Sequence, residues 1–185
     1  MLILIYTDNI SCRTDALIRK YKTRDPFELC DALGIRIRLK DLGTAIKAYY
    51  FCQSRIRNIV LNTRSGETVQ RVLCAHELGH AVLHGELAAM RGFSELELFD
   101  ATSRTEYEAN MFAAELLIDN GELSELLADG ESSFFTAAGK LYVPAELLDF
   151  KLRIMKSKGY RIEAPYIARS DFLKEDIPGC FGQSR

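Results

Sequence analysis

The sequence lacks several features that would place it in a common functional class. No apolar run approaches the roughly eighteen residues of a membrane-spanning helix. The opening stretch, residues 1–6, is apolar but lacks the basic segment and the small-residue cleavage site of a signal peptide. No block of like charges occurs, and the formal net charge is only -2. We therefore expect neither a membrane protein nor a general nucleic-acid binder, which needs a concentrated positive field.

The cysteines do not form a recognisable framework. They are odd in number, scattered along the chain, and never spaced as C-x-x-C. In a chain of this size without a secretion signal, such cysteines indicate reduced thiols, several of them serving as small core residues. We expect a cytoplasmic protein on this ground.

The composition is otherwise that of an ordinary folded protein. Of the 185 residues, 48% are hydrophobic and 27% are charged, which is enough to bury a core. The length suits one domain, or one domain with a small appendage. We expect a main domain over residues 1–121, followed by a helical subdomain and tail over residues 122–185 that packs on or beside it.

Two helices are predicted near the start of the chain. Apolar residues spaced three and four apart indicate a short helix over residues 14–24, with Thr14 as a possible N-cap. Asp25 and Pro26 suit the N-cap and the first position of a second helix, which Gly34 would end.

Three strands are predicted after these helices. Residues 35–39 alternate strictly between apolar and polar, as a half-buried strand does. Residues 46–52 and 56–62 are rich in β-branched and aromatic residues, and the polar turn 53–55 makes a hairpin their simplest pairing. A sheet of this kind has an edge strand, to which an extended peptide could add by main-chain hydrogen bonds.

The second half of the chain is predicted to be helical. Helical periodicity covers residues 103–118, 122–129, 134–141 and 144–158, whereas the pattern weakens from Tyr160. The predicted fold class is therefore α+β, mainly helical, with a small and mostly antiparallel three-stranded sheet and a C-terminal helical subdomain.

One stretch carries recognisable chemistry. His76-Glu77-Leu78-Gly79-His80 reads H-E-x-x-H within an apolar, helix-like segment over residues 67–85. Residues i and i+4 lie on the same face of a helix, so His76 and His80 could hold one metal ion. Glu77 would lie beside a metal-bound water, as the general base of a helical zinc peptidase site does. Gly79 would allow another element to approach closely.

A catalytic zinc needs a third protein ligand. The metzincin arrangement would place a histidine at position 86, which is Glu86, so that class is excluded. The remaining source is a carboxylate from the helix over residues 103–118. Glu106, Glu108 and Glu115 are the candidates, although Glu106 also suits a capping box with Ser103. The small Ala109 after Glu108 would permit close packing on the motif helix, and the residues alone leave the three open.

His84 continues the four-residue spacing from His80. Three ligands in a row along one helix diverge too far to meet at a tetrahedral ion, so we expect His84 to support the site without binding the metal. The group that would stabilise an oxyanion is not identified by the sequence. His84 and Tyr107 are the two residues considered for it.

Two runs together resemble a known family. Ala75 to Gly85 reads A-H-E-L-G-H-A-V-L-H-G, and Glu106 to Leu117 reads E-Y-E-A-N-M-F-A-A-E-L-L. The pair is similar to the A-H-E-L-G-H-x-x-x-H and E-A-N-x-F-A-A-x-L-L motifs of the ImmA/IrrE family of metallo-endopeptidases. The likeness also covers the lead-in over residues 20–62 and the stretch 142–159. It departs after Leu117, where the family often has Met-Pro.

The resemblance implies a site. His76 and His80 match the family's zinc-binding histidines, and Glu77 matches its catalytic glutamate. The glutamate that precedes Ala-Asn in the family motif falls on Glu108, so the resemblance favours Glu108 as the third ligand of Zn²⁺. It also implies that residues 1–121 form a zincin-like metallopeptidase domain.

The resemblance further implies a target. Members of the family are intracellular proteins of bacteria and their phages or mobile elements, and they inactivate helix-turn-helix repressors, often by cleavage. We see no helix-turn-helix domain at the N-terminal end, so the repressor would be a separate protein. The expected function is thus a zinc endopeptidase that cleaves a repressor, with a zinc-stabilised anti-repressor that only sequesters its partner as the alternative.

Overall fold

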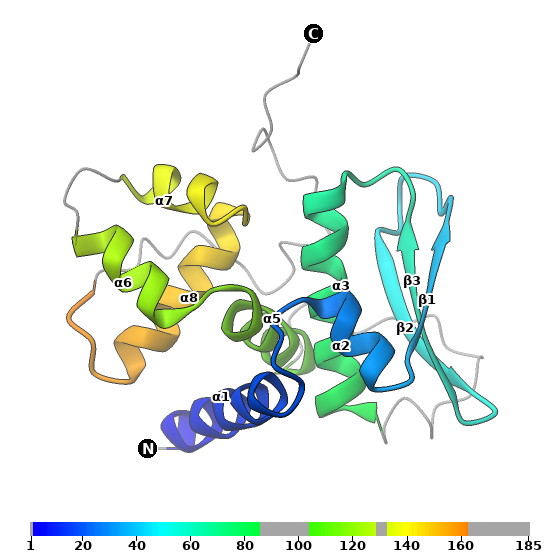
Figure 1. Cartoon of the computed structure of the whole chain (residues 1–185), viewed down its shortest axis with the longest axis horizontal. Coiled ribbons are helices and arrows are strands. Elements are labelled where there is room, and N and C mark those ends of the chain that lie inside the picture. The colour runs from blue at the N-terminus through cyan, green and yellow to red at the C-terminus, as the bar shows by residue number, and fades with distance from the viewer. Residues whose placement is uncertain (1, 86–103, 129–132, 163–185) are drawn as a thin grey trace, which may run out of the picture.

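The computed structural model describes residues 2–85, 104–128 and 133–162. Its elements, in chain order, are α1 (Leu2–Tyr21), α2 (Pro26–Ala32), β1 (Arg36–Lys40), β2 (Ala48–Gln53), β3 (Ile56–Asn62), α3 (Glu67–Leu83), α5 (Arg104–Leu117), α6 (Asn120–Ala128), α7 (Phe134–Lys140) and α8 (Ala145–Ser157). The fold is α+β, as predicted, and the small sheet lies to one side of the helices (Figure 1).

Helix α3 lies at the middle of the described structure. It contacts β2 and β3 of the sheet, and it packs against α5. On the far side of α5 lie α1 and α8, so the order of layers is sheet, α3, α5 and then the outer helices (Figure 1). One hydrophobic core runs through these layers, and it includes Leu61 of β3, Leu78 of α3, Phe112 of α5 and Leu148 of α8.

The sheet has the strand order β1-β3-β2. Strands β2 and β3 form the predicted antiparallel hairpin, whose turn residues Ser54 and Arg55 have positive φ angles of 51° and 65°. The pairing of β1 with β3, however, is parallel, so the sheet is mixed rather than mostly antiparallel. Strand β3 takes the centre of the sheet and is its most buried strand, with Ile59 and Leu61 fully buried. The hairpin makes β2 antiparallel to β3, while β1 pairs in parallel with the other edge of β3.

The first two helices begin differently from each other. Asp25 is the N-cap of α2, as predicted, and its carboxylate accepts from the N–H groups of Phe27 and Glu28. Thr14, in contrast, is not a cap, because α1 starts at Leu2 and Thr14 lies within it. The Thr14 hydroxyl is buried and donates to the carbonyl of Ile10, one turn back.

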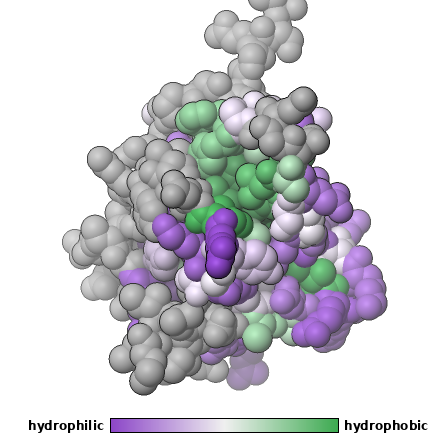
Figure 2. All heavy atoms as spheres, turned by 90° about the vertical axis from the view of Figure 1, so that its left-hand side faces the viewer, coloured by the Kyte–Doolittle hydropathy of each residue, from purple (hydrophilic) through white to green (hydrophobic). Residues whose placement is uncertain are grey.

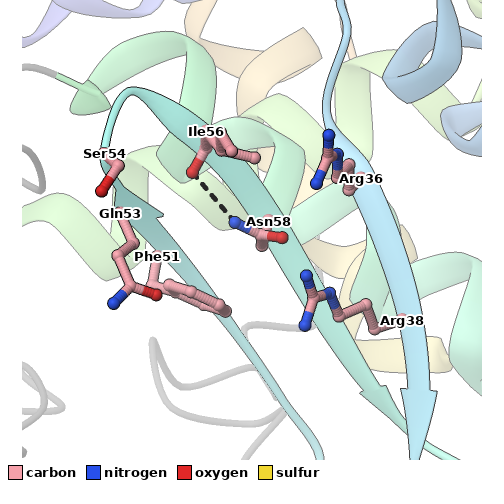
Figure 3. Close-up of a pocket in the computed structure, with 7 residues that line it drawn as sticks. All are labelled: Arg36, Arg38, Phe51, Gln53, Ser54, Ile56 and Asn58. Carbon is pink, nitrogen blue, oxygen red and sulfur yellow. Dashed lines mark hydrogen bonds between the residues drawn. The ribbon is translucent and has the colours of Figure 1, made fainter.

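The face of the sheet directed away from the helices carries a small pocket of about 130 Å³ (Figure 3). Arg36 and Arg38 of β1 line it on one side and Phe51 of β2 on the other, with Asn58 of β3 between them. None of its seven lining residues is acidic or a histidine, so it offers no metal ligand of the predicted kind.

The opposite side of the molecule has a different surface. Figure 2 shows apolar side chains gathered near the centre of this face and hydrophilic ones beside them. Helix α7 lies on this side in Figure 1, and its Phe135 is 69% exposed. No described helix is both long enough and apolar enough to cross a bilayer.

Candidate metal centre

The H-E-x-x-H motif lies in the buried middle of α3. Every residue from Val72 to Ala81 is buried, because the sheet covers one side of the helix and α5 covers another. The one-turn spacing brings the His76 and His80 rings to a centroid distance of 4.8 Å, and their Nε2 atoms are 3.1 Å apart. Both imidazoles therefore offer Nε2 to one point in the protein interior.

A glycine sets how closely α5 approaches this point. A Cβ atom added at Gly79 would lie 3.1 Å from the Cα of Ala109 and 3.2 Å from the Cβ of Phe112. The two helices thus pack backbone against backbone, which only small residues allow. This confirms the sequence-based expectation that Gly79 permits a close approach.

The close packing brings one carboxylate to the two imidazoles, and it belongs to Glu106. Its Oε2 lies 3.4 Å from His76 Nε2, and its Oε1 lies 3.3 Å from His80 Nε2. One ligand atom from each of the three residues lies within 4.8 Å of the other two, and all three side chains are buried. Among the described residues this is the group of histidines and carboxylates that could hold a metal ion.

Glu108, the residue favoured by the resemblance, is not in this group. Successive residues of a helix are rotated by about 100°, so Glu106 and Glu108 point in directions about 200° apart. Glu106 faces His76 and His80, whereas the Glu108 carboxylate pairs with His84 and Arg104. The third position of the cluster therefore goes to Glu106. The predicted capping box for Glu106 depended on Ser103, which lies outside the described residues.

Two other residues considered from the sequence also point elsewhere. Glu115 accepts hydrogen bonds from Ser11, Lys151 and Lys158, and so it ties α5 to α1 and α8. The Tyr107 ring packs against Phe150 of α8 at a centroid distance of 5.3 Å. The structure brings neither side chain into the cluster around His76 and His80.

The remaining ring nitrogens of the histidines have partners of their own. His76 Nδ1 lies 2.8 Å from Oδ1 of Asn110, which is one turn after Glu106 on α5. His80 Nδ1 lies 3.4 Å from Nδ1 of His84. If Nδ1 of His76 donates its proton to the amide oxygen, Nε2 keeps its lone pair for a metal ion.

Glu77 is buried at the side of the same cluster. Its carboxylate accepts a hydrogen bond from the backbone N–H of Tyr50 on β2. Burial raises the pKa of Glu77, against the opposing effect of His80 and His76. A raised pKa suits a group that must take up a proton and later release it.

The charges of the cluster are mutually dependent. Burial acts against protonation of His76, but the carboxylates of Glu106 and Glu77 outweigh it and raise the His76 pKa. Burial likewise opposes ionisation of Glu106, yet its contacts with the two histidines hold the Glu106 pKa far below its usual range. The carboxylate is therefore ionised at neutral pH.

The donor set fits a divalent metal of the zinc type. Two imidazole nitrogens and one carboxylate oxygen are the ligands of a known class of catalytic zinc site, which leaves one position for water. The buried Glu106 carboxylate has no lysine or arginine partner among the described residues. A bound cation would supply that missing positive charge.

The sequence predicted that the two histidines and Glu77 lie together, and the resemblance favoured Glu108, whereas the structure brings Glu106 to the two histidines. The signal that could have found Glu106 is its four-residue spacing to Asn110, which puts both polar side chains on one face with Ala109 and Ala113 beside them. The role of Asn110 at His76 was not predicted.

Comparisons with known proteins point to a metallopeptidase family. Residues 30–153 match the model of peptidase family M78, described as the IrrE N-terminal-like domain. The chain is 29% identical over 164 residues to "Metallopeptidase ImmA" of Bacillus subtilis (strain 168), a match that covers 87% of this chain and 95% of the relative. It is 33% identical over 142 residues to "Uncharacterized immunity region protein 2" of Bacillus phage phi105, covering 77% and 88%. The chain therefore belongs to the ImmA/IrrE family of metallopeptidases, as its two helix motifs predicted.

Proposed function

We propose that this protein is a zinc-dependent endopeptidase that inactivates a separate helix-turn-helix repressor by cleaving it. The observation that carries the proposal is the cluster of His76, His80 and Glu106 with Glu77 buried beside it. Family membership supports a metallopeptidase, and the donor set supports zinc.

The residues divide the work of peptide hydrolysis. His76, His80 and Glu106 would hold the ion, which when bound supplies a Lewis acid for the peptide carbonyl and acidifies a water molecule. Glu77 takes the proton of the attacking water and passes it to the nitrogen of the leaving amine. Its burial favours this exchange, because the pKa of its carboxyl group is raised.

The edge of the sheet offers a place for the substrate. In the described part of the chain, β2 is an edge strand, and its residue Tyr50 directs a backbone N–H to Glu77. An extended peptide that paired with β2 would therefore run past the proposed general base. This supports cleavage within an extended or locally unfolded segment of the target.

The choice of a repressor as the target rests on the names of two relatives and on the family resemblance. One relative is named as an immunity region protein of a phage, and another as the metallopeptidase ImmA. The family resemblance implies that members inactivate helix-turn-helix repressors of phages and mobile elements. The corresponding partner of this chain would carry that fold.

The test is a single change in the general base. We expect Glu77→Gln to keep its zinc, because Glu77 is not a ligand, and to cleave the repressor at least a hundredfold more slowly. Zinc content is measured by metal analysis, and cleavage is measured by gel electrophoresis of purified repressor with time. Glu67→Gln, at an exposed position in the first turn of the same helix, is the matched control.

The same variant separates cleavage from sequestration. If Glu77→Gln still relieved repression in cells as well as the native chain does, cleavage would not be the mechanism, and the protein would act by holding its partner. If the native chain held no metal after purification and reconstitution with zinc, the zinc site itself would be wrong.

A further inference from the structure

A line of polar contacts leads from the proposed metal site to the surface. His80 Nδ1 lies 3.4 Å from Nδ1 of His84, and His84 Nε2 lies 2.9 Å from Oε2 of Glu108. The other oxygen of Glu108, Oε1, accepts from Nε of Arg104 at 2.6 Å. The His84 side chain is buried, that of Glu108 is 15% exposed, and that of Arg104 is 60% exposed.

The chemistry of a metal ligand fixes the direction of these hydrogen bonds. If His80 binds the ion through Nε2, its proton is on Nδ1, and that N–H donates to His84 Nδ1. His84 then accepts at Nδ1 and carries its own proton on Nε2, which donates to the Glu108 carboxylate. Arg104 in turn donates to Glu108. Every donor in the series meets an acceptor, and each ring has one tautomer.

We propose that His84 and Glu108 are positioning residues that hold His80 in the orientation and tautomer required for metal binding. Glu108 thus serves the site through His84, one step removed from the ion, while Glu106 binds directly. This inference rests on the metal site proposed above.

The proposal accounts for two features that the zinc cluster alone does not use. His84 follows His80 by one turn, so the helix itself places the two rings at a centroid distance of 5.5 Å. Glu108 is half a turn from Glu106 and reaches His84 near the C-terminal end of α3. One short stretch of α5 therefore supplies both the carboxylate that would bind the ion, Glu106, and the carboxylate that supports His80 through His84, Glu108.

The two histidine ligands would be supported in different ways. His76 has a direct neutral acceptor in Asn110, whereas His80 reaches a charged acceptor only through a second imidazole. A carboxylate at the end of such a hydrogen-bonded series makes the ligating ring a stronger electron donor, as carboxylate–histidine–zinc triads do.

The experiment measures zinc affinity of the full-length protein by competition with a chromogenic chelator. We expect His84→Ala and Glu108→Ala each to weaken zinc binding by about ten- to hundredfold. We expect the double variant to bind no more weakly than His84→Ala alone, because Glu108 acts only through His84. Glu108→Gln, whose amide oxygen can still accept from His84, should recover part of the affinity.

Cobalt substitution gives a second readout that a general loss of stability would not change. The visible absorption of Co²⁺ in the site should shift in His84→Ala and Glu108→Ala but not in Glu125→Ala, an exposed glutamate on α6. Thermal unfolding of the metal-free proteins shows whether each variant is folded.

Three outcomes would overturn the proposal. The first is unchanged zinc affinity and an unchanged cobalt spectrum in both single variants. The second is a loss of affinity in Glu108→Ala as complete as in Glu106→Ala, which would make Glu108 a ligand. The third is strictly additive losses in the double variant. Zinc binding by a native chain that cleaves no repressor would contradict the proposed function but leave this inference standing.

Discussion

Helix α5 carries two buried glutamates whose surroundings differ in one decisive respect. Glu106 faces α3, and its charged partners among the described residues are the imidazoles of His76 and His80. Glu115, two and a half turns later, faces α1 and α8 and meets the ammonium groups of Lys151 and Lys158. Both carboxylates are 4% exposed, and the pKa of each is lowered despite its burial.

The difference lies in where the compensating charge comes from. Glu115 is neutralised by cations that belong to the chain, so its cluster is complete and structural. Glu106 has imidazole partners that are positive only when protonated, and a neutral imidazole is free to bind a metal ion. A buried carboxylate beside imidazoles is therefore available to a metal ion, while a buried carboxylate beside lysines is not.

The largest effect is expected at the metal side of this comparison. Glu106→Ala should weaken zinc binding by more than about a hundredfold, because it removes a ligand. This loss exceeds the one expected for residues that only hydrogen-bond to a ligand, such as His84. Chelator competition measures this directly. Equal zinc affinity in Glu106→Ala and the native chain would remove Glu106 from the site and return the third position to another carboxylate.

The next largest effect is expected at Glu115, in the stability of the fold. Glu115→Gln should destabilise the fold by about 3 kcal/mol, because it leaves Lys151, 1% exposed, without its carboxylate partner. Urea unfolding of the metal-free protein measures this. Glu122→Gln, at an exposed position on α6, is the control and should change stability by less than about 0.5 kcal/mol.

The pH dependence of the unfolding free energy tests the same contact between Glu115 and Lys151. Burial raises the Glu115 pKa, but the two lysines and Ser11 outweigh this and lower it to about 2, against 4.5 for an ordinary glutamate. A lowered folded-state pKa gives stability that is present above about 4.5 and is lost as the pH falls toward 2. The difference in unfolding free energy between the native chain and Glu115→Gln should shrink over that window. A difference that stayed constant there would mean that the charge of Glu115 is not what holds α8 to α5.

The smallest effect on stability is expected at the contact between α3 and α5. Gly79→Ala gains about 1 kcal/mol in helix propensity, but its Cβ would press on the Ala109 backbone at 3.1 Å. We expect a net loss of about 1 kcal/mol in stability, together with weaker zinc binding, because α5 must move and carry Glu106 with it. Gly66→Ala, at a position with open space around it, is the matched control. Unchanged zinc affinity in Gly79→Ala would show that this contact does not set the position of Glu106.

Much of the fold could be predicted where local rules decide. The N-cap Asp25, the hairpin of β2 and β3, and the helical phase of His76 and His80 all depend on residues a few positions apart. The parallel pairing of β1 with β3 could not be predicted in this way. It depends on which strand takes the buried centre of the sheet, which is decided by the packing of all three strands together.

The sequence by itself determined that two imidazoles and a glutamate would share one helix. The four-residue spacing of H-E-x-x-H places both histidines on one face of that helix and the glutamate at the edge of the face. Only the tertiary structure decided which carboxylate completes the group. That choice depends on how α5 is rotated and how closely it packs, which the contact between Gly79 and Ala109 sets across thirty positions of chain. The rotation gives Glu106 to the two histidines and Glu108 to His84, because residues two positions apart on a helix point in nearly opposite directions.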